Sequence, residues 1–272
     1  MDEKLTQDQR LTELVEAFKT DSGEYQDIET PGDTDGRRRL LRSLMNIRMP
    51  RRMPTPMAPE TLRIQDRYLQ ERAEDKGIVR LENIPVKEGV ISLWQGDITR
   101  LAADAIVNAA NSQMLGCFVP MHTCIDNCIH TFAGVQLRAE CDRQMNRLRA
   151  KFGPDYEQPT AGPMLTDAYN LPAKKVIHIV GPIVSDRLTP EQEQDLADCY
   201  SNTLDLCEEN GLRSVAFCCI STGVFHFPPE QAAQIAVKTV RLWLAEHNGV
   251  MDRVIFNVFG DKSRMIYERL FE

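Results

Sequence analysis

Five short apolar runs in the stretch from Gly89 onward constrain the fold of this chain more than any other feature. They span Val90 to Trp94, Ala105 to Asn108, Val176 to Val180, Val215 to Ile220 and Val254 to Phe259. Their continuous β-branched and aromatic character is typical of strands that are buried on both faces. Because helical segments separate them, we predict an α/β fold: a mixed, mainly parallel sheet in a three-layer α/β/α sandwich.

Two of these separating segments carry clear helix boundaries. One runs from Pro190 to Asn210 and is followed by Gly211, and the other runs from Pro229 to Asn248 and is followed by Gly249. Proline early in a helix and glycine just past its end is the expected arrangement. Since such sheets bind ligands at the carboxyl ends of their strands, we look for chemistry in the loops that follow the apolar runs.

The first 83 residues have a different pattern, rich in charge and with apolar residues at helical spacing. Thr6 and Gln9 are spaced as a capping box, and further helices are predicted over Arg37–Ile47 and Glu60–Asp75, on either side of a proline-rich break at residues 49–59. We expect residues 1–85 to form a helical extension packed on a main domain of residues 86–272. The arginines at 37–39 are interpreted as a solvated helix face.

Composition narrows the class of protein. The chain has 272 residues and a formal net charge of −8, which argues against a general nucleic-acid binder. No apolar run is long enough to span a bilayer, and the N-terminus lacks an apolar signal core, so we expect a cytoplasmic protein without a membrane partner. We also expect a monomer without a nucleic-acid partner. In a reducing cytosol the eight cysteines should be thiols or metal ligands.

A loop that begins at Gly116 reads GCFVPMHTCIDNCIH and concentrates metal-binding residue types. Cys117, His122 and Cys124 form a C-x4-H-x-C array, which suits zinc and leaves one coordination position open for substrate. Two alternatives stay open: buried thiols beside a core histidine, or a four-ligand structural site that also uses Cys128 or His130.

A helix is predicted after this loop, from Ile125 to Arg138. Asp126 lies at its start, where a negative charge is favoured, and His130 lies four residues later on the same face. Asp126 is therefore within reach of the loop metal.

Polar residues follow several of the predicted strands. Asp97 can accept hydrogen bonds from an exocyclic amine such as that of adenine, but capping of the next turn is the more common role. Asn108 and Asn111 suit either ribose hydroxyls or a turn.

The segment after the fourth run offers a phosphate-binding loop. Ser221 to Val224 are small residues ahead of a helix N-terminus, so their N–H groups can cradle a diphosphate, and Phe225 can cover a ribose. Phe259, after the last run, can stack on a base, although core packing is its default interpretation.

Together these segments resemble the macrodomain family of ADP-ribose-binding modules. The resemblance rests on QGDIT, DAIVNAAN, the helix with ID-x-x-IH-x-x-AG and the strand ending in ISTGVF, in that order, and it covers Gly89 to the C-terminus. Most macrodomains have a glycine-rich loop where this chain has GCFVPMHTC. That replacement resembles the zinc-dependent bacterial and fungal branch, whose members are associated with sirtuin-type ADP-ribosyltransferases. Asn127 stands where the family has a glycine.

The resemblance implies a role for each matching residue. Adenine would contact Asp97 and Ile98, and the distal ribose would contact Asn111. The diphosphate and ribose would be held by Ser221, Thr222, Gly223, Val224 and Phe225. Zinc would be held by Cys117, His122 and Cys124, and the scissile bond would lie near Asp126.

The implied activity is zinc-dependent hydrolysis of mono-ADP-ribose from acidic side chains of a modified protein. Zinc would act as a Lewis acid or template, Asp126 as the base or water-orienting group, and Asn111 would orient the ribose. Two alternatives use the same pocket: ADP-ribose binding without turnover, with a structural zinc, and deacetylation of O-acetyl-ADP-ribose.

Overall fold

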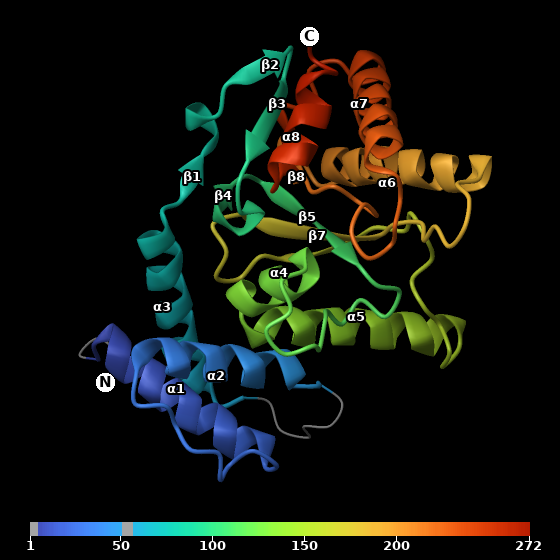
Figure 1. Cartoon of the computed structure of the whole chain (residues 1–272). Coiled ribbons are helices and arrows are strands. Elements are labelled where there is room, and N and C mark those ends of the chain that lie inside the picture. The colour runs from blue at the N-terminus through green and yellow to red at the C-terminus, as the bar shows by residue number, and fades with distance from the viewer. Residues whose placement is uncertain (1–4, 51–56) are drawn as a thin grey trace. The chain divides into compact units, whose positions relative to one another are not determined.

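A computed structural model of the chain describes residues 5–50 and 57–272, which form two compact units (Figure 1). The helical unit comprises the residues up to Gly77 together with Leu115–Gln144 and Tyr169–Leu171. The sheet unit comprises Ile78–Met114, Met145–Ala168 and Pro172–Glu272. The division of the chain into an extension of residues 1–85 and a main domain of residues 86–272 stays a prediction.

The sheet unit is built on seven strands. Their order across the sheet is β2 (Val86–Glu88), β3 (Ile91–Gln95), β9 (Arg253–Val258), β8 (Ser214–Phe217), β5 (Ala105–Ala110), β7 (Lys175–Val180) and β6 (Met164–Asp167). The five strands from β3 to β7 are mutually parallel, whereas the edge strands β2 and β6 are antiparallel to their neighbours. The predicted α/β class and the mixed, mainly parallel sheet are confirmed.

All five predicted strands are present, and the largest difference in their bounds is at the end of β8. Strand β8 ends at Phe217, three residues before the predicted end at Ile220. The chain leaves the sheet there because Ile220 N donates to Cys218 O at 2.9 Å and Ser221 adopts a left-handed φ of 63°. The edge strands carry no apolar run, and all three residues of β2 are exposed, so the sequence pattern did not reveal them.

Helices α6 (Pro190–Glu209), α7 (Pro229–Glu246) and α8 (Asp261–Glu268) and the last part of α5 (Val135–Phe152) belong to the sheet unit, together with a short pairing of β1 (Val79–Arg80) and β4 (Leu101–Ala102). Helices α6 and α7 pack on each other, and α8 packs on α7 and β3 (Figure 1). The two longer helices begin at the predicted prolines. Tyr200 of α6 lies against Phe217 of β8 in the core, with 4.8 Å between the ring centroids.

The helical unit contains α1 (Gln7–Ser22), α2 (Thr34–Ile47), α3 (Pro59–Lys76), α4 (Ile125–Ala133) and the first part of α5 (Val135–Phe152). The predicted capping box of Thr6 and Gln9 starts α1. Leu14, Phe18, Leu44 and Tyr68 belong to a shared apolar core of these helices. Most of the predicted proline-rich break, residues 51–56, lies outside the described residues.

The prediction of one helix from Ile125 to Arg138 is wrong. Helix α4 ends at Gly134, whose φ of 95° is left-handed, and α5 begins at the next residue. The Gln65 side chain accepts a hydrogen bond from Val135 N at 3.1 Å, which replaces the helical acceptor that the break removes.

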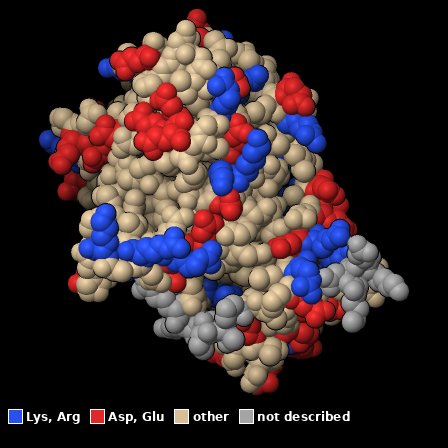
Figure 2. Space-filling model, turned by 180° about the vertical axis from the view of Figure 1, so that it is seen from behind, with Lys and Arg blue, Asp and Glu red and all other residues tan. Residues whose placement is uncertain are grey.

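Within residues 5–50 and 57–272, no helix combines the length and apolar character that a membrane crossing requires. Figure 2 shows acidic and basic side chains interspersed on the face that it displays. The expected monomeric state, the cytoplasmic location and the expected lack of a nucleic-acid partner stay predictions.

Candidate functional site

Cys117, His122 and Cys124 come together in the helical unit. Their ligand atoms all lie within 4.8 Å of one another, and Cys117 Sγ is 3.5 Å from His122 Nδ1. Tetrahedral zinc with Zn–S of about 2.3 Å and Zn–N of about 2.05 Å separates two such atoms by roughly 3.6 Å. The donor set and its spacing therefore fit a zinc ion.

The start of α4 fixes the third of these side chains. Cys124 is the N-cap residue of the helix, and its Sγ accepts a hydrogen bond from Asn127 N at 3.4 Å. Burial raises the pKa of the Cys124 thiol to about 12, the nearby Cys117 and Asp126 add to the rise, and the Asn127 N–H opposes it. A divalent cation between the two sulfurs would reverse this balance, since it stabilises thiolates directly.

Asn127 organises the cysteine loop. This fully buried side chain donates from Nδ2 to Cys117 O at 3.3 Å and to Val119 O at 3.0 Å. Its Oδ1 accepts from Arg42 Nη2 at 2.9 Å, and the same Nη2 donates to His122 O at 2.7 Å. A side-chain amide thus holds the loop through contacts on both sides.

Arg138 provides a second fastening of the same loop. Its Nη1 donates to the carbonyls of Met45, Asn46 and Arg48, and its Nη2 donates to Cys117 O at 3.5 Å. The sequence did not reveal Arg42, Arg138 or the organising role of Asn127, because hydrogen bonds between residues that are not neighbours in the sequence produce no periodic pattern.

Asp126 is buried in the first turn of α4. Its Oδ1 is 3.6 Å from His130 Nε2, which confirms the predicted contact between these two residues. The His130 ring packs on Gly116, where an added Cβ would lie 2.7 Å from the ring and where φ is 80°. Gly116 is therefore required for the loop to close over the helix.

The geometry bears on the four-ligand alternative. Among the residues that the structure describes, neither Cys128 nor His130 belongs to the group formed by Cys117, His122 and Cys124. The sulfur of Cys128 instead lies 3.6 Å from Arg42 Nη2 and 3.9 Å from Thr123 O.

In the sheet unit, Asp97 takes the capping role. Its Oδ1 accepts hydrogen bonds from Thr99 N at 3.0 Å and Thr99 Oγ1 at 2.6 Å, at the start of the 3₁₀ helix η3 (Ile98–Arg100). Ile98 is buried beside it. Asn111 follows β5, is half-buried, and accepts from Gln113 N at 3.1 Å through Oδ1.

Asn108 is a structural residue rather than a ribose ligand. It is fully buried in β5, and its Nδ2 lies 3.0 Å from Nδ1 of His178 on β7. Thr166 Oγ1 lies 3.0 Å from the other ring nitrogen. Burial lowers the pKa of His178 to about 3, so the ring is neutral and serves as a hydrogen-bonding partner between strands.

The loop between β8 and α7 contains Ser221, Thr222, Gly223, Val224 and Phe225. Ser221 is buried with a left-handed φ, and its Oγ has no hydrogen-bond partner. Gly181 lies directly against it, since a Cβ added there would be 2.1 Å from Ser221 Oγ. Gly223 and Val224 at the tip of the loop are exposed, so their backbone is open to a ligand.

Phe259 corrects a sequence-based expectation. It follows β9 with 80% of its surface exposed, so core packing, its default interpretation, is wrong. The preceding Asn257 is buried and donates to Gly96 O at 2.9 Å, which fastens the end of β3 to β9.

The structure distributes the predicted site residues over the two units. Cys117, His122, Cys124 and Asp126 belong to the helical unit. The others follow β3, β5 and β8, whose carboxyl ends meet at one edge of the sheet because these strands are parallel.

Comparisons with known proteins agree on one family. The Macro domain family matches residues 107–236. The chain is 47% identical over 270 residues, 98% of this chain and 99% of the relative, to "Protein-ADP-ribose hydrolase" of Treponema medium. It is 41% identical to the protein of the same name from Staphylococcus aureus, over 95% of this chain and 94% of the relative. The Trypanosoma brucei macrodomain, solved in complex with ADP-ribose, superposes with a TM-score of 0.64 at 31% identity, over 82% of this chain and 94% of that one.

Proposed function

We propose a zinc-dependent removal of mono-ADP-ribose from modified protein side chains, on the premise that this chain belongs to the macro domain family and is a protein-ADP-ribose hydrolase. The finer parts of the proposal are the metal, the ester linkage to an acidic side chain and the residues that act. One observation carries the metal and the acting residues: three metal-binding side chains at suitable spacing lie in one loop, directly before a buried carboxylate. The ester linkage follows from the resemblance alone.

The proposed ligand contacts in the sheet unit follow from the chemistry of each strand end. Asp97 and Ile98 would contact the adenine. Phe259, the residue that follows β9, offers an exposed aromatic ring on which a base can stack. The loop from Ser221 to Phe225 would hold the diphosphate on its backbone N–H groups, while Asn111 would orient the distal ribose. The Ser221 hydroxyl, buried without a partner, is suited to a phosphate oxygen.

Within the helical unit, Cys117, His122 and Cys124 would hold zinc, which when bound supplies Lewis-acid stabilisation of negative charge. Asp126 would take a proton from the attacking water or orient it, and His130 Nε2 lies 3.6 Å from its carboxylate. Asn127 and Arg42 keep the metal-binding loop in the required shape.

Release of ADP-ribose from a mono-ADP-ribosylated protein, measured with and without a strong chelator, tests the proposal. Chelation and Cys117→Ser should each abolish release and remove one zinc per chain. Cys128→Ser is the matched control and should keep both. Binding of ADP-ribose that needs no metal, with no release from any modified protein, would identify a binding module and overturn the proposal.

Defined substrates test the linkage. A glutamate ester of ADP-ribose should be hydrolysed, while arginine-linked ADP-ribose should not. In heavy-oxygen water the label enters ADP-ribose if water attacks the ribose carbon and enters the glutamate carboxyl if it attacks the ester carbonyl. A protein modified by a sirtuin-type ADP-ribosyltransferase is the proposed physiological substrate, and O-acetyl-ADP-ribose is the competitor that tests for deacetylation.

A further inference from the structure

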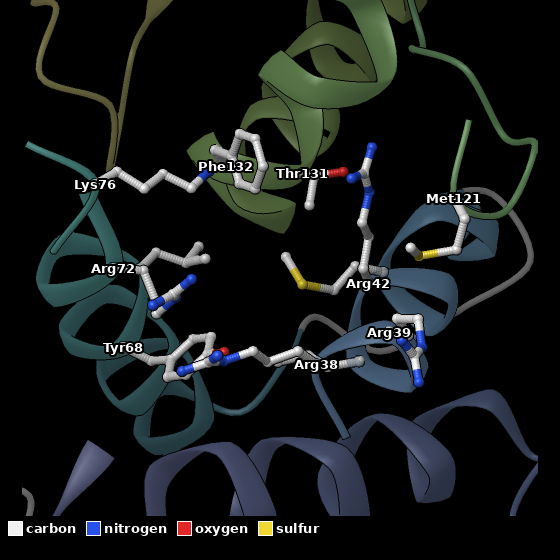
Figure 3. A pocket seen from close by; sticks show the side chains of 12 residues that line it. Arg38, Arg39, Arg42, Tyr68, Arg72, Lys76, Met121, Thr131 and Phe132 are labelled. Atoms are coloured by element: carbon white, nitrogen blue, oxygen red, sulfur yellow. The ribbon is translucent and has the colours of Figure 1, made fainter. Parts of the chain in front are cut away.

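A pocket of about 220 Å³ opens in the helical unit, between α2, α3 and α4 (Figure 3). Its lining consists of Arg38, Arg39, Leu41, Arg42, Met45, Tyr68, Leu69, Arg72, Lys76, Met121, Thr131 and Phe132. Every charged residue in this lining is basic, although the chain as a whole carries a net charge of −8. The pocket is therefore a local site for negative charge.

Arg38, Arg39 and Arg72 keep most of their capacity to bind an anion, whereas Arg42 and Lys76 already contact other groups. Arg38 and Arg72 pair with Asp35 and Asp75 at 3.1 and 3.2 Å, but these are solvent-facing pairs within one helix turn and neutralise little. Arg39 and Arg72 line the pocket and are partly or fully exposed, so their guanidinium groups offer positive charge and donors that a carboxylate can bind.

The aromatic residues argue against a nucleotide as the occupant. Phe132 already lies under Lys76 Nζ, 3.3 Å from the ring centroid, and Arg42 Cζ is 5.7 Å from the same centroid. Tyr68 is only 5% exposed. Neither ring offers the open face that a base needs for stacking.

The remaining lining is aliphatic apart from Thr131, whose hydroxyl is bonded to Asn46 and Asn127. Leu41, Met45, Leu69 and Met121 present flexible apolar side chains, which adapt to the shape of a bound residue. Carboxylates set around an apolar side chain, as in an acidic polypeptide segment, match both parts of this surface.

The pocket is continuous with the loop that carries the metal ligands. Met121 lines the pocket and directly precedes His122, and Arg42 donates to His122 O at 2.7 Å. We propose that this pocket binds an acidic segment, with an apolar residue in it, of the ADP-ribosylated protein substrate. This inference rests on the proposed function and specifies its substrate class.

A pair of variants with equal charge change tests the proposal kinetically. Arg39→Gln with Arg72→Gln removes two pocket cations, and Arg63→Gln with Arg67→Gln removes two exposed cations of α3 that do not line the pocket. For an ADP-ribosylated peptide rich in Glu and Asp around one Leu, the pocket variant should raise KM about tenfold and leave kcat unchanged, since two charge-assisted contacts are lost. For a short, uncharged ADP-ribosylated peptide both variants should match the wild type.

A binding measurement separates this inference from the proposed function, because it needs no turnover. The unmodified acidic peptide, carrying a fluorescent label, should bind the full-length protein in an anisotropy titration, weaken with salt, and bind about tenfold less tightly to the pocket variant than to the control variant. Equal binding to both variants would overturn the inference even if hydrolysis is observed. The inference would also be overturned if millimolar ADP or inorganic phosphate displaced the peptide from wild type while the pocket variant bound the peptide as tightly as wild type does.

Discussion

The cysteine loop of the helical unit and the β8–α7 loop of the sheet unit are held in different ways. The backbone of the first is fastened by helix side chains: Arg42 and Asn46 of α2, Asn127 of α4 and Arg138 of α5. The second is held mainly by its own backbone, as in the bonds from Phe227 N to Ser221 O and from His226 N to Gly223 O.

The difference has a physical reason in the ligand that each loop is proposed to hold. A metal needs side-chain donors at fixed positions, so the backbone that bears them must be fixed by other groups. A diphosphate is bound by backbone N–H groups, so the backbone conformation itself is the site. The first loop should fail when supporting side chains are removed, and the second when its backbone is displaced.

The strongest test of the cysteine-loop region is Asp126→Ala. Loss of the proposed base should lower kcat about 10²- to 10⁴-fold. ADP-ribose affinity measured by calorimetry should stay within about twofold, because the proposed proton transfer acts in the transition state and not in ligand binding. His130→Gln, which removes the partner at 3.6 Å, should have a much smaller effect. Wild-type turnover in Asp126→Ala would assign the proton transfer to another group.

Asn127→Ala should separate the two loops. It removes the donor to Cys117 O and Val119 O and the acceptor of Arg42, so zinc affinity should fall about 10- to 100-fold in a competition titration with a chromophoric chelator. Thr222→Ala is the counterpart in the other loop, where one bond to Cys219 O is lost. Its zinc affinity should equal that of wild type, and a similar loss in both variants would contradict the comparison.

Gly181→Ala displaces the second loop without touching the first. The new methyl group would lie 2.1 Å from Ser221 Oγ and 2.7 Å from Ile220 Cγ2. Relief of this overlap should cost about 1–3 kcal/mol of stability, and ADP-ribose affinity should fall roughly tenfold, about 1.4 kcal/mol. Zinc content should not change. Gly32→Ala, where nothing lies within 4 Å, is the control, and unaltered ADP-ribose binding in Gly181→Ala would argue against this loop as the diphosphate site.

The smallest expected effect concerns His178 in the sheet unit, whose pKa burial lowers from 6.5 to about 3. The unfolded chain takes up a proton below pH 6.5 that the folded ring does not, so this contribution to stability is complete above pH 6.5 and is lost as the pH falls. The loss should be about 1 kcal/mol between pH 6.5 and 5.5. Urea unfolding at both pH values should show it in wild type and not in His178→Gln. Equal pH dependence in the two proteins would mean that the folded ring titrates normally.

Much of the sheet was predictable because its signals are local. The apolar composition of a run such as Val176 to Val180 predicts by itself a buried strand. The edge strand β2 was missed because its three residues are exposed and form no apolar run. The break between α4 and α5 was missed for a related reason. Gly134 is tolerated within a helix in many sequences, and only the Gln65 side chain, which accepts from Val135 N, favours the break here.

The sequence by itself determined the five parallel strands, helices α1, α2, α3, α6 and α7, and the array of Cys117, His122 and Cys124, because periodicity and spacing lie within short segments. The tertiary structure alone decided which side chains support that array. The bond from Arg42 to His122 O joins residues 80 positions apart, and the one from Arg138 to Arg48 O joins residues 90 apart. It also decided the basic pocket: Arg38 and Arg39 belong to the cluster interpreted as a solvated helix face, and residues of α3 and α4 line the same pocket. Contacts of this range depend on packing in three dimensions, and a linear pattern carries no record of them.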